Sequence, residues 1–267
     1  MGTLFVETSV RLPREAAARD AVVDRLWALT QDPVMHPRWD LRFSSITPTG
    51  HDDAGAQLFT YALALPHPRW PVRTVRGTGA STAGRRDASG RGASALRWTS
   101  ADPLSPLGPG AGWWRYAPEG DAVRFVTGYD YAPGWGRLGR VLDPWLVRPL
   151  VGWATAWSFD RLRLWVEAGA DPARSRDLAV ARAGARLLAA LAGAVLAARG
   201  PAGAVPGAVL LALARWAPLP DAVPSARRCR RRPADRRPPR PPSSLADLHE
   251  PAPLGASGEP LPVSPSW

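Results

Sequence analysis

The chain has 267 residues, of which 45% are hydrophobic, so it is long and apolar enough to bury one sizeable core. Every basic residue is an arginine, so a coding bias explains the formal net charge of +11 better than selection for phosphate contacts does. Nucleic acid is therefore not expected as a partner. The single cysteine, Cys229, excludes an intrachain disulfide, and residues 1–15 lack the basic start and apolar block of an export signal. These features predict a cytoplasmic protein.

The arginines are unevenly distributed. Residues 1–170 hold 20 Arg and 16 acidic residues, a balance of +4, whereas residues 171–267 hold 14 Arg and 7 acidic residues, a balance of +7. The excess lies in a Pro-rich stretch that cannot bury enough apolar surface to fold by itself. We therefore expect a folded domain over 1–170, an Ala-rich helical hairpin over 171–218 and a disordered Arg/Pro-rich tail over 219–267.

The domain is expected to begin with a strand and a helix. Residues 4–12 alternate and include β-branched side chains, which indicates a strand, and residues 13–33 then show helical periodicity. Four further segments are bounded by Gly, Pro, Asp or Ser clusters and have strand-like composition. They predict antiparallel strands of a meander over 41–49, 56–66, 73–82 and 93–101.

Residues 112–131 form the clearest predicted hairpin, with its turn at Pro118–Asp121. We expect Ala117 to oppose Ala122, which places the charged side chains on one face and the apolar ones on the other. A sheet with such a division must cover something apolar. The expected inner face consists of Leu96, Trp98, Trp114, Tyr116, Val123, Phe125, Thr127, Tyr129 and Tyr131.

A long helix is expected to close the domain near Gly169. Asp143 is a suitable N-cap, Pro144 fits the first helical position, and Pro149 is expected to kink or restart the helix. The helix is predicted to be amphipathic and therefore not to span a membrane. Its expected apolar stripe consists of Leu150, Trp153, Trp157 and Leu164, and Asp160, Arg163 and Glu167 are expected well to one side of it.

Arg161 interrupts this pattern, because the same helical spacing places it near the middle of the apolar stripe. A buried guanidinium needs a partner, since an unpaired charge in an apolar setting costs several kcal/mol. One interpretation is an ion pair with Glu7 or Asp130, or a head group that reaches solvent at the helix edge. The other is that Arg161 faces a cavity and holds the carboxylate or phosphate of a ligand.

The order of one strand, one helix, antiparallel strands and a long last helix is that of an α+β helix-grip fold. The opening "LPRE...LWALTQDPVMHPRWDLRF" resembles START-like lipid-transfer and polyketide-cyclase (SRPBCC) domains, in which a helix leads through a "D-P" break to a "W-D" before the second strand. The resemblance covers residues 3–168. It implies a curved antiparallel sheet around the long helix, with an apolar cavity between them that binds lipids, sterols, polyketides or hormones.

Catalytic signatures are absent from the sequence. It has no G-x-S-x-G elbow, Walker loop, H-E-x-x-H or C-x-x-C motif, and we expect no cofactor. The Gly-rich run over 77–84 matches no phosphate-binding fingerprint, and we interpret its glycines as turn residues. His36 lies four residues from both Asp32 and Asp40, but prolines forbid the regular helix that would gather the three. We therefore expect an exposed or capping histidine and no metal site.

The region after the domain contains two apolar helical segments, over 174–201 and 202–218. Their uninterrupted apolar stretches, 187–198 and 202–214, are shorter than the roughly 20 residues that a membrane span needs. Their outer flanks are basic, as a hairpin with cytoplasmic ends requires. Both a membrane contact through residues 175–218 and a soluble appendage therefore remain as interpretations.

Two classes of function are consistent with the sequence. The first is the binding of a hydrophobic small molecule or lipid in an internal cavity, and the second is a cyclase or dehydratase acting on a hydrophobic, polyketide-like substrate. A membrane-tethered accessory protein is a third interpretation. No acid and base pair is evident, so binding is preferred. The predicted ligand-binding residues are Trp39, Tyr61, Trp98, Trp114, Tyr116, Phe125, Tyr129, Trp153, Trp157 and Arg161.

Overall fold

The computed structural model describes residues 3–67, 70–82, 84–234 and 240–254. The strands are β1 (Leu4–Arg11), β2 (Ser45–His51), β3 (Gln57–His67), β4 (Trp70–Ser81), β5 (Arg85–Arg86), β6 (Gly92–Thr99), β7 (Leu107–Glu119) and β8 (Ala122–Pro133). The helices are α1 (Ala16–Gln31), α2 (His36–Trp39), α3 (Gly136–Leu142), the π-helix η1 (Asp143–Val147), α4 (Arg148–Ala168), α5 (Pro172–Ala198), α6 (Pro201–Trp216) and the short 3₁₀ helices η2 (Ala226–Arg228) and η3 (Ser243–Leu245).

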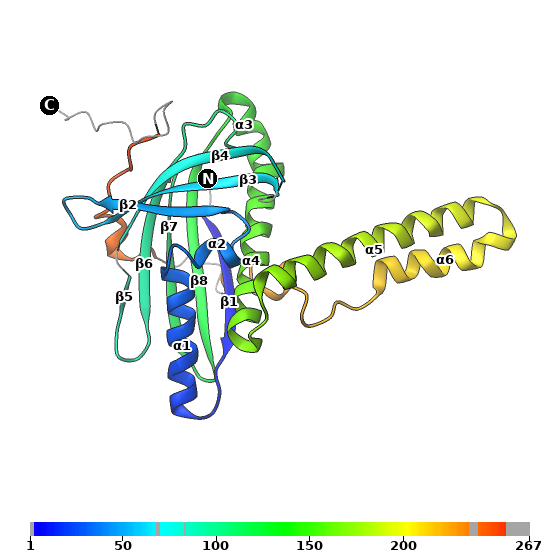
Figure 1. The fold of residues 1–267 in the computed structure, drawn as a ribbon, viewed down its shortest axis with the longest axis horizontal. Coiled ribbons are helices and arrows are strands. Elements are labelled where there is room, and N and C mark those ends of the chain that lie inside the picture. The colour runs from blue at the N-terminus through cyan, green and yellow to red at the C-terminus, as the bar shows by residue number, and fades with distance from the viewer. Residues whose placement is uncertain (1–2, 68–69, 83, 235–239, 255–267) are drawn as a thin grey trace.

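The strands form one antiparallel sheet in the order β1-β8-β7-β6-β4-β3-β2, with β5 paired to β6 (Figure 1). This confirms the predicted meander. Helices α1 and α4 pack on one face of the sheet, which we call the inner face. Its core contains apolar side chains from β1, β8 and α4, among them Val6, Phe125 and Phe159, which are fully buried. The expected helix-grip arrangement is therefore present.

The β7–β8 hairpin has the predicted faces but not the predicted register. Tyr116 opposes Phe125, whereas the expected partner was Val123. The turn is tighter than expected, because Glu119 already pairs with Ala122 and Gly120 adopts a left-handed conformation at φ 59°. The register error is two residues, and the side chains of a strand repeat every two residues. The inner face therefore keeps its predicted members.

Helix α4 continues from the π-helix η1 without a break and has Pro149 in its first turn, so the expected irregularity near this proline is present as a π-helical segment. Its predicted apolar stripe is wrong at the N-terminal end, where Trp153 is 44% exposed and Leu150 is also exposed. The polar side is also not solvated, because Asp160 is fully buried. Residues far along the chain cover this side of α4, which helical periodicity alone cannot reveal.

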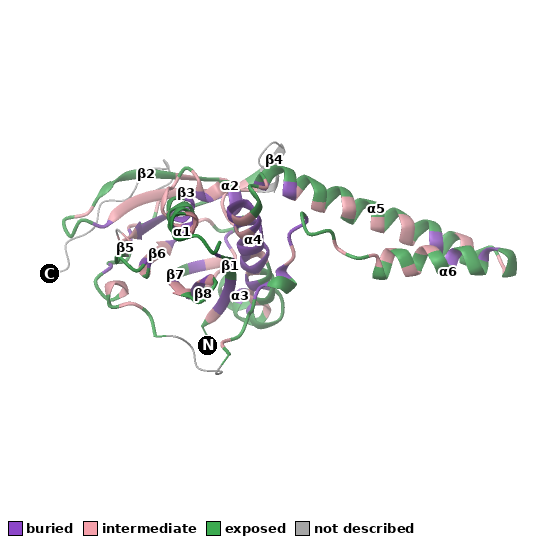
Figure 2. Ribbon diagram, turned by 90° about the horizontal axis from the view of Figure 1, so that it is seen from below, coloured by how far each residue is buried: buried purple, intermediate pink, exposed green. Residues whose placement is uncertain are grey.

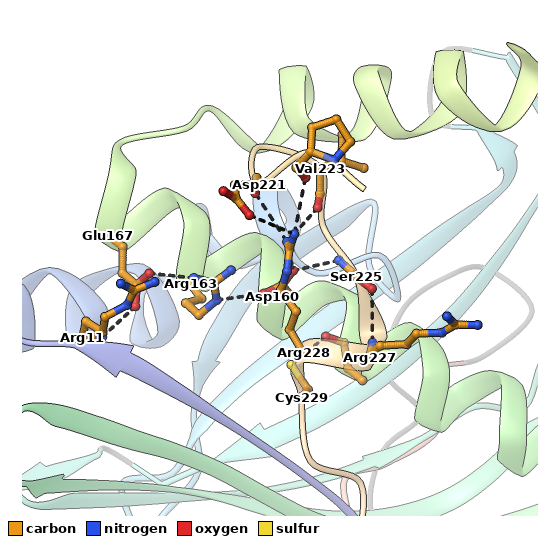
Figure 3. A network of polar contacts seen from close by, with 12 residues as sticks. Arg11, Asp160, Arg163, Glu167, Asp221, Val223, Ser225, Arg227, Arg228 and Cys229 are labelled. Carbon is orange, nitrogen blue, oxygen red and sulfur yellow. Dashed lines mark hydrogen bonds and ion pairs between the residues drawn. The ribbon is translucent and has the colours of Figure 1, made fainter. Parts of the chain in front are cut away.

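Those residues belong to the segment predicted to be disordered. Residues 221–230, which we call the strap, lie along α4, and Val223, Ala226 and Cys229 are buried there (Figure 3). Arg230 also pairs with Glu7 of β1 through its backbone. The expectation of disorder therefore does not hold for the strap, because buried carboxylates pair with two of its arginines, Arg228 and Arg230.

A second part of the tail covers the outer face of the sheet. Leu248 is buried against Phe5 and Trp113, and the Thr78 hydroxyl donates to the Ala252 carbonyl at 2.6 Å. This face of the sheet is apolar enough to hold an extended segment without regular structure. The rest of the predicted disordered tail, 235–239 and 255–267, lies outside the described residues.

Helices α5 and α6 pack against each other as an antiparallel hairpin that projects away from the sheet domain (Figures 1 and 2). Close approach of the two helices is possible where Gly193 of α5 meets Gly207 of α6, since a side chain at either position would collide with the opposite backbone. Most of the hairpin surface is exposed, and much of it is apolar. The exposed apolar side chains include Leu187, Leu188, Leu191, Val195, Val205, Val209, Leu213 and Trp216.

Candidate functional site

Aromatic side chains lie over glycines on the inner face of the β2, β3, β4 and β6 part of the sheet. Tyr61 opposes Gly77 and Phe59 opposes Gly79 across β3 and β4. A Cβ atom at either glycine would collide with the opposing ring, so each ring lies flat on the neighbouring strand. Trp98 lies over Gly110 of β7 in the same way. Because the glycines have no side chains, these rings lie flat on the sheet and form an apolar surface, which we call the aromatic floor.

This aromatic floor is only partly covered. Helix α4 packs over β1, which is the edge strand at the opposite end of the sheet from β2. The inner-face side chains near β2 consequently keep part of their surface exposed, whereas those near β1 are buried. The half-buried side chains of the floor are Phe59, Tyr61, Leu63, Leu96 and Trp98.

A buried ion pair lies where the floor meets the core. Asp40 is 1% exposed, and Arg42 binds it in a bidentate manner through Nε at 3.0 Å and a terminal nitrogen at 2.7 Å. The His36 imidazole lies 3.0 Å from the second carboxylate oxygen. The guanidinium of Arg42 lies over the rings of Tyr129 and Phe43. The pair therefore connects the loop after α2 to the aromatic inner face.

The protonation state of this cluster follows from its contacts. Burial alone would raise the pKa of Asp40, but the charge of Arg42 and the hydrogen bonds from His36 and Arg42 lower it well below its usual range. Burial likewise opposes the charged form of Arg42, yet the charge of Asp40 raises the pKa of its guanidinium. Both groups are ionised at neutral pH, and both oxygens of Asp40 are occupied.

Two tyrosines add hydroxyl groups to the same surface. Tyr129 is buried, and its hydroxyl shares a 2.6 Å hydrogen bond with the hydroxyl of Thr155 in α4. The Tyr61 hydroxyl donates to the Thr99 carbonyl at 3.3 Å, and burial raises the pKa of Tyr61. Burial raises the pKa of Tyr129 as well, so both phenols stay protonated at neutral pH and can act as hydrogen-bond donors or acceptors.

Four of the predicted site residues lie in the packed core. Trp39 is fully buried and donates from its indole nitrogen to the Leu29 carbonyl at 2.8 Å. The rings of Trp39, Trp114, Tyr116 and Phe125 each lie against other aromatic rings. Packing against these neighbours occupies the surface that would line a cavity. The predicted residues with a place on the aromatic floor or beside it are Tyr61, Trp98 and Tyr129.

The three predicted site residues of α4 lie elsewhere. Trp153 and Trp157 line a groove between α4, the hairpin and the strap. Arg161 is 4% exposed, donates to the Arg38 carbonyl at 2.6 Å and lies over the Trp157 ring. Burial and the nearby charge of Arg176 lower the pKa of Arg161 to about 10. The predicted ion pair with Glu7 or Asp130 is wrong, since both carboxylates pair with other arginines.

Several features of the site differ from the sequence-based predictions. His36 is buried, not exposed, because its ring stacks on Trp39. Gly77 and Gly79 are in strand β4 rather than in a turn, where they make room for the rings of β3. The role of Arg42 was missed, although its position two residues after Asp40 in "WDLR" is compatible with a local ion pair. Within the described part of the chain, no cluster of three or more potential metal ligands occurs.

No model of a protein family matches the sequence, but a curated protein is similar to it. The curated relative, the "Uncharacterized membrane protein YndG" of Bacillus subtilis (strain 168), is 42% identical over 153 residues. The match covers 57% of this chain and 56% of the relative, so it extends over about half of that protein's length.

Solved structures with similar backbones are distant in sequence. TTHA0849 from Thermus thermophilus is 16% identical, with a TM-score of 0.45 over 63% of this chain and 99% of that one. A STAR-related lipid transfer protein fragment from Xanthomonas axonopodis is 16% identical, with a TM-score of 0.41 over 60% and 82%. The Zhui aromatase/cyclase from Streptomyces sp. R1128 is 14% identical, with a TM-score of 0.42 over 63% and 97%.

The arrangement of the chain's own elements defines its fold. A first strand leads through two helices into an antiparallel sheet, and the long helix α4 returns to pack on the inner face. The inner face carries the aromatic floor, and the ion pair of Asp40 and Arg42 adjoins it. The chain therefore has an α+β helix-grip fold, in which a curved antiparallel sheet packs around the long helix α4.

Proposed function

We propose that the domain binds a hydrophobic small molecule or lipid on the aromatic floor of the inner face. The observation that supports this most directly is that aromatic rings lie on glycines of the sheet and that no helix fully covers them. A fully packed interior would bury Phe59, Tyr61 and Trp98, whereas each of them remains partly accessible. Flat rings offer a large apolar contact area, and mostly apolar surfaces with a few polar groups are typical of ligand sites.

The polar groups beside the floor suggest how such a ligand would be oriented. Arg42, Tyr61 and Tyr129 surround the floor with one cation and two hydroxyl groups. A ligand with an apolar body and a polar or acidic end fits this distribution. A cyclase or dehydratase is less well supported, because Asp40 already accepts hydrogen bonds on both oxygens and offers no free base.

Filling the floor is expected to abolish binding without unfolding the domain. Leu96 is half-buried and opposes Ser81 and Gly112, so the variant Leu96→Trp would occupy the space above these small residues. We expect its affinity for the fluorescent fatty acid cis-parinaric acid to fall by about tenfold or more, as measured by fluorescence titration.

Ala62→Trp is the matched control, because Ala62 is also half-buried but points to the outer face of β3. This variant should bind the probe as the unmodified protein does. Equal affinity of Leu96→Trp and the unmodified protein, or no binding by any of the three, would remove the basis for this site. Organic extraction of the purified protein followed by mass spectrometry identifies any ligand retained from the cell.

We further propose that the α5–α6 hairpin attaches this domain to a membrane. Within the described residues, α5 is one helix that is long and apolar enough to cross a bilayer, and α6 is a shorter apolar helix. No acidic residue occurs between Asp177 and Asp221, whereas arginines and Trp216 lie near the domain end of the hairpin. Basic and aromatic residues at this position are typical of a membrane interface.

The dimensions of the hairpin are compatible with insertion from one side. At 1.5 Å per residue, α6 is about 24 Å long, and the apolar part of α5 from Leu187 to Ala198 is about 18 Å long. Half of the hydrocarbon core is about 15 Å. The tip would therefore pass the midplane, and the long side chain of Arg199 could extend toward the far interface. Both ends of the hairpin would stay on the side of the domain.

Introduction of acidic residues on the apolar surface of α5 is expected to weaken the binding of the protein to vesicles. In the variant Leu188→Glu/Leu191→Glu, two exposed apolar positions become acidic, and insertion of each charge into hydrocarbon is unfavourable. Flotation with phosphatidylcholine vesicles should show a decrease in bound protein of about 100-fold or more.

Val34→Glu/Leu138→Glu provides the matched control, since both residues are apolar and exposed but lie on the domain. This control should float with the vesicles as the unmodified protein does. If the hairpin variant also floats normally, the hairpin is a soluble appendage and the membrane proposal fails.

A further inference from the structure

A basic and aromatic groove lies at the base of the hairpin. It has a volume of about 1150 Å³ and is bounded by α4, the domain ends of α5 and α6, the strap and the residues that lead into it. Three tryptophans, Trp153, Trp157 and Trp216, line it, and no acidic residue does. Its lining also includes Arg182, Arg186, Arg215, Arg227, Arg228 and Arg231.

Most of these arginines lack a carboxylate partner. Arg228 binds the carboxylates of Asp160 and Asp221, whereas the other five form no ion pair with any residue that the structure describes. Such a concentration of positive charge around one groove is repulsive unless an anion enters it. The groove is therefore electrostatically complementary to a phosphate group and not to a neutral or cationic ligand.

The two arginines of α5 are positioned and only partly satisfied. Arg182 and Arg186 donate from terminal nitrogens to carbonyls at the end of α6, with Arg186 reaching the Ala217 carbonyl at 3.2 Å. These carbonyls lack helical partners, so the contacts hold both guanidinium groups at the groove. The Nε atoms of both arginines are buried without a hydrogen-bond partner among the described residues. Each guanidinium therefore keeps a free donor.

The position of the groove relates it to the membrane. The apolar stretch of α5 that no arginine interrupts begins at Leu187, directly after Arg186, and α6 ends at Trp216. If the hairpin enters a bilayer, the groove lies at the level of the lipid headgroups, and the exposed apolar sides of α5 and α6 continue from it into the hydrocarbon. A phospholipid can then place its phosphate in the groove and its acyl chains along the hairpin.

We propose that this groove binds the phosphate headgroup of an anionic phospholipid. The proposal rests on the membrane attachment proposed above and identifies the lipid class that the hairpin selects. Guanidinium groups bind phosphate oxygens by paired hydrogen bonds, and Trp216 is placed to contact the interfacial part of the lipid. The site is separate from the aromatic floor, because it lies on the outer side of α4.

The test compares the binding of the full chain to vesicles of phosphatidylcholine alone and of phosphatidylcholine mixed with phosphatidylglycerol. We expect the unmodified protein to prefer the anionic vesicles. In Arg182→Gln/Arg186→Gln and in Arg227→Gln/Arg231→Gln this preference should fall by about tenfold, while binding to neutral vesicles is retained. The second variant guards against misfolding of the first, because the side chains of Arg227 and Arg231 are exposed and make no hydrogen bond that the structure describes.

Arg137→Gln/Arg140→Gln is the control for net charge, since it removes two exposed arginines of α3 that do not line the groove. It should keep the preference within about twofold, because salt screens exposed charges that do not contact the bound lipid. An unchanged preference in both groove variants, or an equal loss in the control, overturns the proposal. So does the absence of a preference in the unmodified protein.

Inorganic phosphate distinguishes a lipid headgroup from a free anion. If phosphate in solution binds to the unmodified protein and not to the groove variants, while anionic vesicles are not preferred, the groove is a site for a free phosphate and the lipid assignment is wrong. If the full chain binds neither kind of vesicle, the membrane attachment fails, and the phosphate titration still reports on the groove by itself.

Discussion

Replacement of Asp40 by asparagine is expected to lower the free energy of unfolding by about 3–5 kcal/mol, which is the usual effect of removing one partner of a buried ion pair. The carboxylate is fully buried, and its loss leaves the guanidinium of Arg42 without its charged partner. Urea denaturation at neutral pH measures the change. Asp20→Asn is the control, because Asp20 is exposed on α1, and it should leave stability nearly unaltered. A change below about 1 kcal/mol in Asp40→Asn would show that the pair contributes little.

The effect of this substitution is also expected to depend on pH. The folded state lowers the pKa of Asp40, so its charge stabilises the protein above the pKa of the unfolded chain, which is about 4. As the pH falls below this value, the unfolded chain takes up a proton that the folded protein does not. The stability difference between the unmodified protein and Asp40→Asn should therefore be constant near neutral pH and decrease below about pH 4.

The strap is expected to detach from α4 when Asp160 is replaced by asparagine. Asp160 is fully buried, and its oxygens bind Arg163 at 2.8 Å, Arg228 at 3.1 Å and the Ser225 backbone nitrogen at 2.7 Å (Figure 3). The loss of this charge leaves two guanidinium groups without their common partner, and we expect a loss of about 3–5 kcal/mol in the free energy that holds the strap.

Cys229 reports on this detachment directly. Cys229 belongs to the strap, and its thiol is buried against α4, where it donates to the Ala156 carbonyl; burial raises its pKa to about 12. It should therefore react slowly with a disulfide reagent in the unmodified protein and at least about tenfold faster in Asp160→Asn. Asp221→Asn is the matched control, because Asp221 is the exposed second partner of Arg228, and the reaction should remain slow in it. An equally slow reaction in Asp160→Asn would show that other contacts hold the strap.

The parts of the fold that sequence predicts well depend on local periodicity. The alternation in β7 and β8 placed Trp114 and Phe125 on the correct face even though the register was wrong by two residues, since a shift by a full period conserves the face. An irregularity of the last helix near Pro149 is also predictable, because proline removes one backbone donor, and the structure has the π-helix η1 directly before α4.

The parts that could not be predicted depend on contacts between distant residues. Asp160 lies on a polar side of α4 by helical spacing, and this side becomes buried only because strap residues 65 and 68 positions later in the chain bind it. Composition indicates disorder for the strap, because local composition shows its arginines but not the distant carboxylates, Asp160 and Glu7, that pair with them. For the same reason, glycines of β4 were interpreted as turn residues, although their function depends on the rings of β3.

If the hairpin attaches the domain to a bilayer as proposed, the strap limits how the domain can move relative to the lipid surface. The hairpin leaves the domain at the end of α4, where Arg38 binds Asp171 at 3.0 Å, and it returns through the strap to the middle of the same helix. A domain attached at one point could rotate about its linker. Two points of attachment instead fix its orientation and its distance from the bilayer. The entrance to the aromatic floor would then face one direction relative to the lipid surface, and release of the strap would restore rotational freedom.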